Sequence, residues 1–486
     1  MKSSVLTRRR LLQQGSRVFA AAAFFRGLTL GASEAHTSVM SELSRYMAAA
    51  KERPLPDEVV EAAKLHTLDT FAAMISGSQL PPGRAAIQFA RLYGGAPVAT
   101  VVASRIVCGP IEAALTNGML AHSDETDDSH APSESHPGCA IIPAAFATGE
   151  PFEISGMHFL RAVVLGYDIG TRVGMAVGGL DFEVKTHRDA HNLTEGFGSA
   201  AACGCVASLN SQQMRWLLDY ASQQYSGVYA WQRDTDHIEK AFVFGGMPAR
   251  DGATAALVVK SGWTGLDDIF SGSNNFLLST SPDANPASLV EKLGERYEIN
   301  RTGLKKWTVG SPIQAPLDAV ELLLKKYRFN ADQVQEVIVR GPTQEMAIVT
   351  DRTMPDICLE HMIAIMLIDK TVSFRSSHDK ARMQDPEVLR QRQKIKLAPS
   401  EDLQKRLPRR EAIVEIRLVD GRQLSEHVEA VRGSAENPMT RDDVKAKSRD
   451  LISPVLGEEA CKVLIENIVN LERVKDLRDL RLLLQI

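Results

Sequence analysis

The feature that most constrains this chain is a polar segment, residues 122–138 (HSDETDDSHAPSESHPG), set between two apolar runs. It holds three histidines, three aspartates, two glutamates and four serines. The apolar residues at 111–121 and 139–147 favour burial of both its ends. Three interpretations are open from spacing alone: a capped and solvated loop, an acid–base site, or a metal site with carboxylate and imidazole ligands.

The first 35 residues predict an export signal rather than part of the fold. Thr7-Arg8-Arg9-Arg10-Leu11-Leu12 precedes a weakly apolar run at 18–30, and small residues follow at 32–35. Twin arginines, a modest apolar region and an alanine-ending tail resemble a twin-arginine signal peptide. We therefore expect a periplasmic protein that folds before export, with residues 1–35 removed from the fold.

Charge and hydropathy exclude some partners. The chain carries a net charge of −4 and residues 1–35 carry +5, so the remainder carries −9. An acidic chain without a basic stripe is a poor nucleic-acid binder, and an anionic substrate would need a local basic cluster. We find no apolar run long enough to span a membrane after residue 35, so we expect no stable membrane insertion. The six cysteines form no CxxC pair and are expected to be small buried residues, not disulfides.

Hydrophobic periodicity predicts a protein that is mainly α-helical with a mixed α+β part. Apolar residues recur at helical spacing over 57–77, 157–177 and 212–224. A breaker-rich stretch at 271–286 marks a boundary. Beyond it, residues 334–339 alternate like a strand, and Asp420-Gly421 predicts a hairpin turn. Residues 440–486 return to helix and are expected to rejoin the first helical part.

Three further segments carry side chains suited to anion chemistry. Residues 185–198 place two histidines and Arg188 at a helix start, where carboxylates or phosphates bind well. Lys240 leads an apolar run, and residues 305–318 begin with two lysines and a tryptophan. Each segment taken alone also fits an ordinary structural role: a cap and turn, a surface lysine, or a helix lead-in.

Taken together and in this order, the segments resemble the MmgE/PrpD family over roughly residues 40–475. The matching motifs are NGMLAHSDETDDSH, HNLTEGFGSAAA, EKAFVFGGMPARDG, KKWTVGSPIQAPLDA and the helix that begins at Asp385-Pro386. The family includes 2-methylcitrate dehydratase and cis-aconitate decarboxylase. The resemblance implies a large all-helical domain formed from both chain ends, with a smaller α+β lid domain inserted between them.

In this chain the implied boundaries are 38–272 and 433–486 for the helical domain and 273–432 for the lid. The resemblance also implies a homodimer that needs no metal or other cofactor. Its substrate would be a small di- or tricarboxylate that loses water or CO2, which makes the protein a carbon–oxygen lyase or a carboxy-lyase.

The resemblance implies particular site residues. The family's acidic position falls on Glu125, its hydroxyl on Ser129, and its histidine before Pro-Gly on His136. The histidine of the glycine-rich helix falls on His191 and the active-site lysine on Lys240. Trp307 stands where the family usually has tyrosine, and we include it among the substrate-binding residues. Gln314 stands where decarboxylases often have histidine, and Phe242–Phe244 replaces a histidine that commonly follows the lysine.

We expect His136 to act as the general acid or base. Glu125, Asp127 and Asp128 would orient and tune its imidazole, or take the proton themselves. Charge that develops on a substrate carboxylate needs cations. Lys240 and His191 would supply them, together with Arg188 or Arg250.

Two other functions remain open from the sequence. The departures at Trp307 and Gln314 are compatible with an exported carboxylate-binding protein on a degenerate lyase scaffold. A metal-dependent hydrolase would use His122, Asp127, Asp128 and His130 as ligands.

Overall fold

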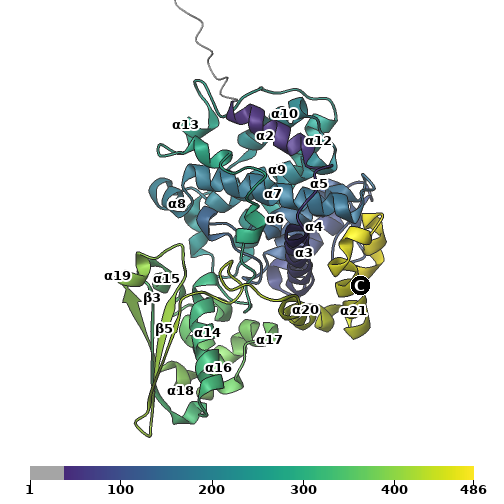
Figure 1. The fold of residues 1–486 in the computed structure, drawn as a ribbon. Helices are drawn as coiled ribbons and strands as arrows, with labels where there is room; N and C mark the ends of the chain where they lie inside the picture. Colours follow the sequence, from purple (N-terminus) through teal and green to yellow (C-terminus); the bar gives the residue numbers. More distant parts are fainter. Residues whose placement is uncertain (1–37) are drawn as a thin grey trace, which may run out of the picture. The chain divides into compact units, whose positions relative to one another are not determined.

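The structure is a computed structural model that describes residues 38–486, and the predicted signal peptide at 1–35 lies outside them. The first part of the chain is helical (Figure 1). Its helices are α2 (Val39–Ala49), α3 (Asp57–Gly77), α4 (Pro81–Tyr93), α5 (Pro110–Ala121), α6 (Gly138–Gly149), α7 (Gly156–Val177), α8 (Leu180–Thr186), α9 (Ala190–Val206), α10 (Ser211–Gln224), α11 (Ile238–Lys240), α12 (Met247–Lys260) and α13 (Phe276–Thr280). Between α11 and α12 runs η3 (Ala241–Gly246), a turn of π-helix.

The second part mixes helices with a sheet. Its helices are α14 (Ser311–Lys326), α15 (Thr343–Val349), α16 (Leu359–Asp369), α17 (Phe374–His378), α18 (Pro386–Arg392), α19 (Glu401–Gln404), α20 (Arg441–Leu456) and α21 (Glu458–Val469). The strands of the chain are β1 (Ala99–Thr100), β2 (Val107–Cys108), β3 (Val334–Pro342), β4 (Ile395–Ser400), β5 (Ala412–Leu418) and β6 (Gln423–Val428). The fold is thus mainly helical with small sheets, as the periodicity predicts.

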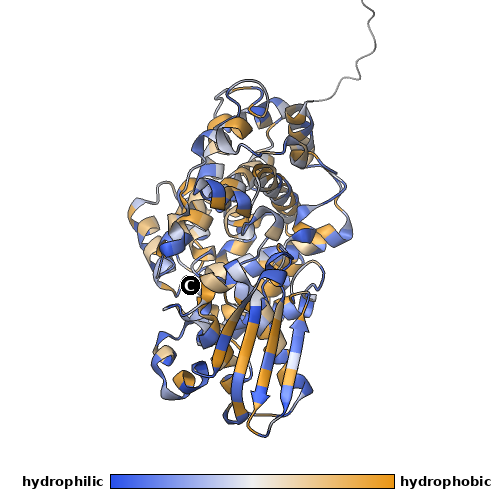
Figure 2. Cartoon of the chain, turned by 90° about the vertical axis from the view of Figure 1, so that its left-hand side faces the viewer, coloured by the Kyte–Doolittle hydropathy of each residue, from blue (hydrophilic) through white to orange (hydrophobic). Residues whose placement is uncertain are grey.

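The four-stranded sheet has the order β4-β3-β5-β6. β3 pairs antiparallel with β5 and parallel with β4, a strand that the sequence pattern missed. The predicted hairpin at Asp420-Gly421 is confirmed, because β5 and β6 pair antiparallel on either side of it. Along β5 buried and more exposed residues alternate. Figure 2 shows the strands of the sheet with both hydrophobic and hydrophilic residues along their length. The sheet packs against α14 through β5 and β6.

Two hydrophobic cores organise the described residues. The first draws on residues 40–304 and again on residues 439–484, and α20 and α21 pack against α3 within it. The second draws on residues 307–428 and joins the sheet to α14 and α16. The domain boundaries at 273 and 433 stay a prediction.

Several local predictions can be compared with the structure. The helix expected at 57–77 is α3 with those bounds, and Pro56 occupies its N-cap. The glycine-rich helix, α9, begins at Ala190, so His191 lies in its first turn and not before it. All six cysteines are buried and free, as predicted. Within residues 38–486, no helix has both the length and the apolar character needed to cross a membrane.

The chain positions η3 by a close backbone contact between two glycines. A Cβ on Gly118 of α5 would lie 2.2 Å from the carbonyl oxygen of Gly245, and a Cβ on Gly245 would lie 2.0 Å from that of Gly118. These distances lie far inside van der Waals contact, so only glycine allows α5 and η3 to approach this closely. Lys240 and Phe244 depend on this contact for their positions.

Gly118→Ala should therefore destabilise the protein by about 1–3 kcal/mol, the usual effect of overpacking a dense interior. Urea denaturation followed by circular dichroism measures the change. Gly196→Ala is the matched control, because a Cβ there meets only Pro248, at 3.9 Å, and alanine favours a helix interior. Equal stability of wild type and Gly118→Ala would contradict the packing argument.

Candidate active site

The polar segment 122–138 connects α5 to α6 and is buried along most of its length. His122 and Asp127 are fully inaccessible, Asp128 is 1% exposed and His136 is 8% exposed. Burying an ionisable group is unfavourable unless it is paired and hydrogen-bonded. The solvated-loop interpretation is therefore wrong, and the compensating contacts define the site.

Charged side chains from distant parts of the chain hold the backbone carbonyls of this segment. Lys305 Nζ donates to the carbonyl of Glu125 at 2.9 Å, and Lys447 Nζ of α20 donates to that of Thr126 at 2.9 Å. Lys447 also pairs with the buried Asp69 of α3 at 2.6 Å. Helix α20 thus fixes the segment from the side of α3.

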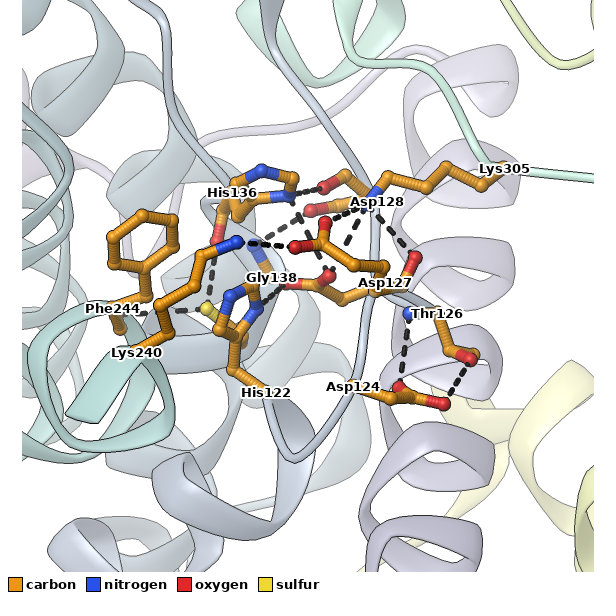
Figure 3. Close-up of polar contacts among 12 residues, drawn as sticks. His122, Asp124, Thr126, Asp127, Asp128, His136, Gly138, Lys240, Phe244 and Lys305 are labelled. Carbon is orange, nitrogen blue, oxygen red and sulfur yellow. Dashed lines mark hydrogen bonds and ion pairs between the residues drawn. The ribbon is translucent and has the colours of Figure 1, made fainter. Parts of the chain in front are cut away.

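Glu125 lies between three cationic or donor groups. Its carboxylate pairs with Lys240 Nζ, accepts from His237 Nε2 at 3.0 Å, and lies 3.4 Å from Lys305 Nζ. Figure 3 shows Lys240 and Lys305 reaching the segment from opposite sides. Burial acts to raise the pKa of Glu125, but Lys240 and then Lys305 hold it well below its usual value. Glu125 is therefore a carboxylate at neutral pH.

The protonation state of Asp127 is the opposite of that of Glu125. Its Oδ2 lies 2.8 Å from Nδ1 of His122, and its Oδ1 lies 3.6 Å from Lys305 Nζ and 3.5 Å from Nδ1 of His136. Burial raises the pKa of Asp127 to about 8, although Lys305 opposes the shift. Burial also lowers the pKa of His122 well below its usual value. Asp127 therefore holds a proton at neutral pH and donates it to the neutral imidazole of His122.

His136 presents a basic nitrogen. Its Nδ1 lies 2.6 Å from the backbone oxygen of Asp128, and a carbonyl only accepts, so Nδ1 carries the hydrogen. Burial, followed by the charge of Lys305, lowers the pKa of His136 well below its usual value. The imidazole is then neutral at pH 7, with its Nε2 lone pair free to accept a proton.

His191 is a charged histidine beside His136. Its Nδ1 lies 3.1 Å from Glu183 and 3.4 Å from Asp189, the N-cap residue of α9. Burial acts to lower the pKa of His191, but Glu183 and Asp189 raise it well above its usual value. Its ring stacks on Phe244 of η3 at 3.8 Å between centroids, and on His136 at 5.5 Å. An imidazolium and a neutral imidazole thus lie face to face.

Asp128 and Ser129 lie at the edge of this cluster. The carboxylate of Asp128 accepts from His66 at 2.7 Å, Tyr167 at 2.6 Å and the backbone N–H of Gly138 at 2.9 Å. These three hydrogen bonds fix the carboxylate of Asp128 at the start of α6, next to His66 and Tyr167. Ser129 is half-buried, and its backbone pairs with that of Gly303.

Three predicted substrate-binding residues are placed outside the cluster. Arg188 lies over the ring of Tyr225 at 4.4 Å. Arg250 pairs with Asp251 at 2.7 Å, and the indole N–H of Trp307 donates to Asp318 at 2.9 Å. Within the described part of the chain, these three have no hydrogen bond or ion pair with the cluster residues. His130, proposed as a metal ligand, turns away to Ser133 at 2.7 Å.

Two groups at the site were missed by the sequence argument. Lys305 belongs to a quoted motif, but nothing in the sequence distinguishes it from Lys306, which pairs with Glu321 at 2.6 Å. His237 precedes α11 with a left-handed backbone, φ +61°, and points its ring at Glu125. Such a conformation is uncommon for a residue other than glycine and has no simple sequence signal.

A third missed residue comes from the mixed α+β part. His378 at the end of α17 lies 3.1 Å from the carboxylate of Asp124, which also accepts from the backbone and hydroxyl of Thr126. Burial opposes the shift, but Asp124 raises the pKa of His378 to about 9. This ion pair connects the polar segment to α17.

Some donor groups are close enough to hold a metal ion. His122, Asp127 and His136 form one such set, His122, Glu125 and His237 form another, and each set lies within 4.8 Å. The carboxylates of both sets already face the ammonium groups of Lys240 or Lys305. A divalent cation would have to enter beside these positive charges, so the donor set suits acid–base chemistry better than metal binding.

The sequence matches the two domain models of one family. Residues 41–288 match the MmgE/PrpD N-terminal domain and residues 307–473 match the MmgE/PrpD C-terminal domain. The chain therefore belongs to the MmgE/PrpD family, which confirms the resemblance drawn from the motifs.

Individual relatives are similar at low identity. A cis-aconitate decarboxylase of Aspergillus terreus is 24% identical over 478 residues, 92% of this chain and 96% of its own. The cis-aconitate decarboxylase-like protein oryM of Aspergillus oryzae is 27% identical over 331 residues, 64% of this chain and 67% of its own. The human cis-aconitate decarboxylase is 23% identical over 457 residues, 89% and 91% of the two chains. A lyase is the activity class to which these relatives point.

The raised pKa of Asp127 predicts a stability difference that depends on pH, which a matched variant should not show. In the unfolded chain Asp127 loses its proton near pH 4, but in the folded protein it keeps it to about pH 8. Wild type therefore loses stability relative to Asp127→Asn as pH rises from 5 to 9, by up to about 1.4 kcal/mol per pH unit. Urea unfolding at pH 5, 7 and 9 measures the difference.

Asp420→Asn is the matched control. Hydrogen bonds from the backbone and side chain of Arg422, which stays charged, lower the pKa of Asp420. The contribution of Asp420 is lost only as pH falls through that lowered pKa, so the difference between wild type and Asp420→Asn is constant above pH 5. A difference between wild type and Asp127→Asn that does not vary with pH would contradict the proton assigned to Asp127.

Proposed function

We propose that this protein is a metal-free lyase that removes water or CO2 from a di- or tricarboxylate. The observation that carries the proposal is the pairing of a neutral His136, whose Nε2 is free, with the cations Lys240, Lys305 and His191 in one buried cluster. Proton abstraction next to a carboxylate needs a base of this kind and positive charge around it.

His136 is the proposed base. Its Nε2 takes the proton from the carbon next to a substrate carboxylate, and the C–H electron pair moves toward that carboxylate. His136 Nδ1 stays bonded to the backbone oxygen of Asp128, which fixes the tautomer throughout. The ring is held between His122 and His191, at 5.2 and 5.5 Å between centroids.

Lys240 and His191 are the proposed carboxylate-binding groups. An ammonium has three donors, and Glu125 takes one of those of Lys240. The side chain of Lys240 is also 15% exposed, so a ligand can reach it. Both cations are placed before the reaction begins, which favours the charged transition state without reorganisation.

Asp127 is the proposed proton donor. A carboxyl that stays protonated to about pH 8 can give its proton to a departing hydroxyl, which leaves as water. In a decarboxylation the same proton would go to the carbon from which CO2 departs. His122, hydrogen-bonded to Asp127, holds this group in place.

The remaining predicted residues receive supporting roles. The backbone oxygen of Asp128 accepts from His136 Nδ1 and so positions that ring, and its carboxylate holds the start of α6 through the N–H of Gly138. Ser129 offers a hydroxyl beside the cluster. Arg188, Arg250 and Trp307 have structural partners of their own, and we propose no direct role in the reaction for them.

The larger arrangement is part of the proposal. We infer an all-helical domain from both chain ends and an α+β lid, supported by the two hydrophobic cores. We also propose a homodimer, supported by membership of the family, and export to the periplasm, supported by the sequence of residues 1–35. Sedimentation of the purified protein and fractionation of the producing cells test these two expectations.

His136→Ala and Lys240→Met should each reduce kcat by about a hundredfold or more, the usual loss for a proton-transfer or charge-stabilising group. NMR of a panel of hydroxy- and unsaturated di- and tricarboxylates identifies the product and separates dehydration from decarboxylation. Arg188→Gln is the control and should stay within about threefold of wild type.

Two outcomes would overturn the proposal. Ligand-induced stabilisation with no product from any carboxylate would favour a binding protein. Stoichiometric metal in active protein, with activity lost to a chelator, would favour the metal-dependent hydrolase.

A further inference from the structure

A cavity of about 300 Å³ lies beside the proton-transfer cluster, with Ser129 and Lys305 in its wall. Its size is at the lower end of the range for small-molecule sites. The feature that sets it apart is its charge. The cationic lining residues are Arg301, Lys305, Arg406, Arg409, Arg410 and Arg432. The carboxylates among the lining residues are Glu429 and Glu436.

This concentration of positive charge is unusual for the chain, which carries −4 overall. An acidic protein that binds an anion needs a local basic cluster, since its overall field is repulsive. The cavity supplies such a cluster within the described residues. Walls of low dielectric strengthen its field further.

Two arginines of the cavity have N–H donors that their carboxylate partner does not use. Arg406 and Arg409 share a single carboxylate, Glu411, at 2.7 and 3.8 Å, and His427 uses the same carboxylate at 2.9 Å. A guanidinium has five N–H donors. Arg409 is therefore the least committed of these cations, and its side chain is 54% exposed.

Arg410 is better anchored. It pairs with Glu345 at 2.6 Å and lies 3.4 Å from Glu134, a residue of the polar segment. This contact ties the cavity wall to the segment that carries His136. The positions of the cavity and of the cluster are thus coupled.

Lys305 joins the two sites directly. It lines the cavity, and its Nζ also lies 3.4 Å from the carboxylate of Glu125 and 3.6 Å from that of Asp127. His136, Lys240 and His191 do not line the cavity, so a substrate held at the cluster would reach the arginines past Lys305. Arginine forks match carboxylate geometry and give two parallel hydrogen bonds.

We propose that this cavity is the specificity pocket for the substrate's non-reacting carboxylates, with Arg409 as its principal free donor. The proposal rests on the lyase function proposed above and assigns the residues that select a di- or tricarboxylate over a monocarboxylate. A monocarboxylate would fill the cluster but leave the arginines without a ligand.

The test is isothermal titration calorimetry with tricarballylate, a tricarboxylate that has neither a hydroxyl nor a double bond to react. Arg409→Gln should weaken its binding by about tenfold or more, as expected for a lost charge-assisted hydrogen bond. Butyrate binding, which uses only the cluster, should not change. Arg422→Gln is the matched control, because Arg422 lies at the β5–β6 turn and pairs with Asp420.

The outcomes separate this inference from the proposed function. Unchanged tricarballylate affinity in both Arg409→Gln and the double variant Arg406→Gln/Arg409→Gln would overturn the pocket, even if wild type turns over a carboxylate. In a second outcome, Arg409→Gln loses affinity for tricarballylate but wild type turns over no carboxylate. That result would support the anion pocket and overturn the lyase. Equal losses for tricarballylate and butyrate would show a general structural effect and also count against the pocket.

Discussion

The rest of the structure depends on burying the polar segment 122–138 without leaving its charges unpaired. Three lysines do this, and each comes from a different part of the chain. Lys240 and Lys305 pair with Glu125, and Lys447 holds the carbonyl of Thr126 while it pairs with Asp69. Removing a buried partner leaves an uncompensated charge, which is far more costly than losing a surface pair. The site therefore requires that the central and C-terminal parts of the chain meet at one place.

The helical scaffold provides the geometry that this pairing needs. Gly118 and Gly245 let η3 approach α5 at backbone contact, and η3 then delivers Phe244 to the rings of His122 and His191. A π-helical turn at this point is a local departure from regular helix, and such departures are frequent at functional sites. Packing and chemistry thus share the same few residues.

Much of the fold followed from periodicity, since α3, α10 and the β5–β6 hairpin lie where the pattern predicts them. The polar segment was also visible, because its composition is local. Its partners were not, because pairing across more than a hundred residues leaves no trace in spacing. Lys305 and Lys306 are adjacent and identical in type, yet one enters the site and the other pairs with Glu321. Arg188 and Trp307 have side chains suited to carboxylate binding, but they lie outside the cluster. Arg188 contacts Tyr225, and Trp307 donates to Asp318.

The division of roles among the histidines shows what the sequence cannot express. The rings of His136 and His191 stack with their centroids 5.5 Å apart, and both side chains are buried. Their pKa values nevertheless shift in opposite directions. His191 faces Glu183 and Asp189, so burial is outweighed and the ring is charged. His136 faces Lys305 and bonds to a carbonyl through Nδ1, so burial prevails and the ring is neutral. Pairs of titratable groups pushed apart in this way mark acid and base assignments, and here the surroundings of each ring, rather than its identity, decide which one can accept a proton.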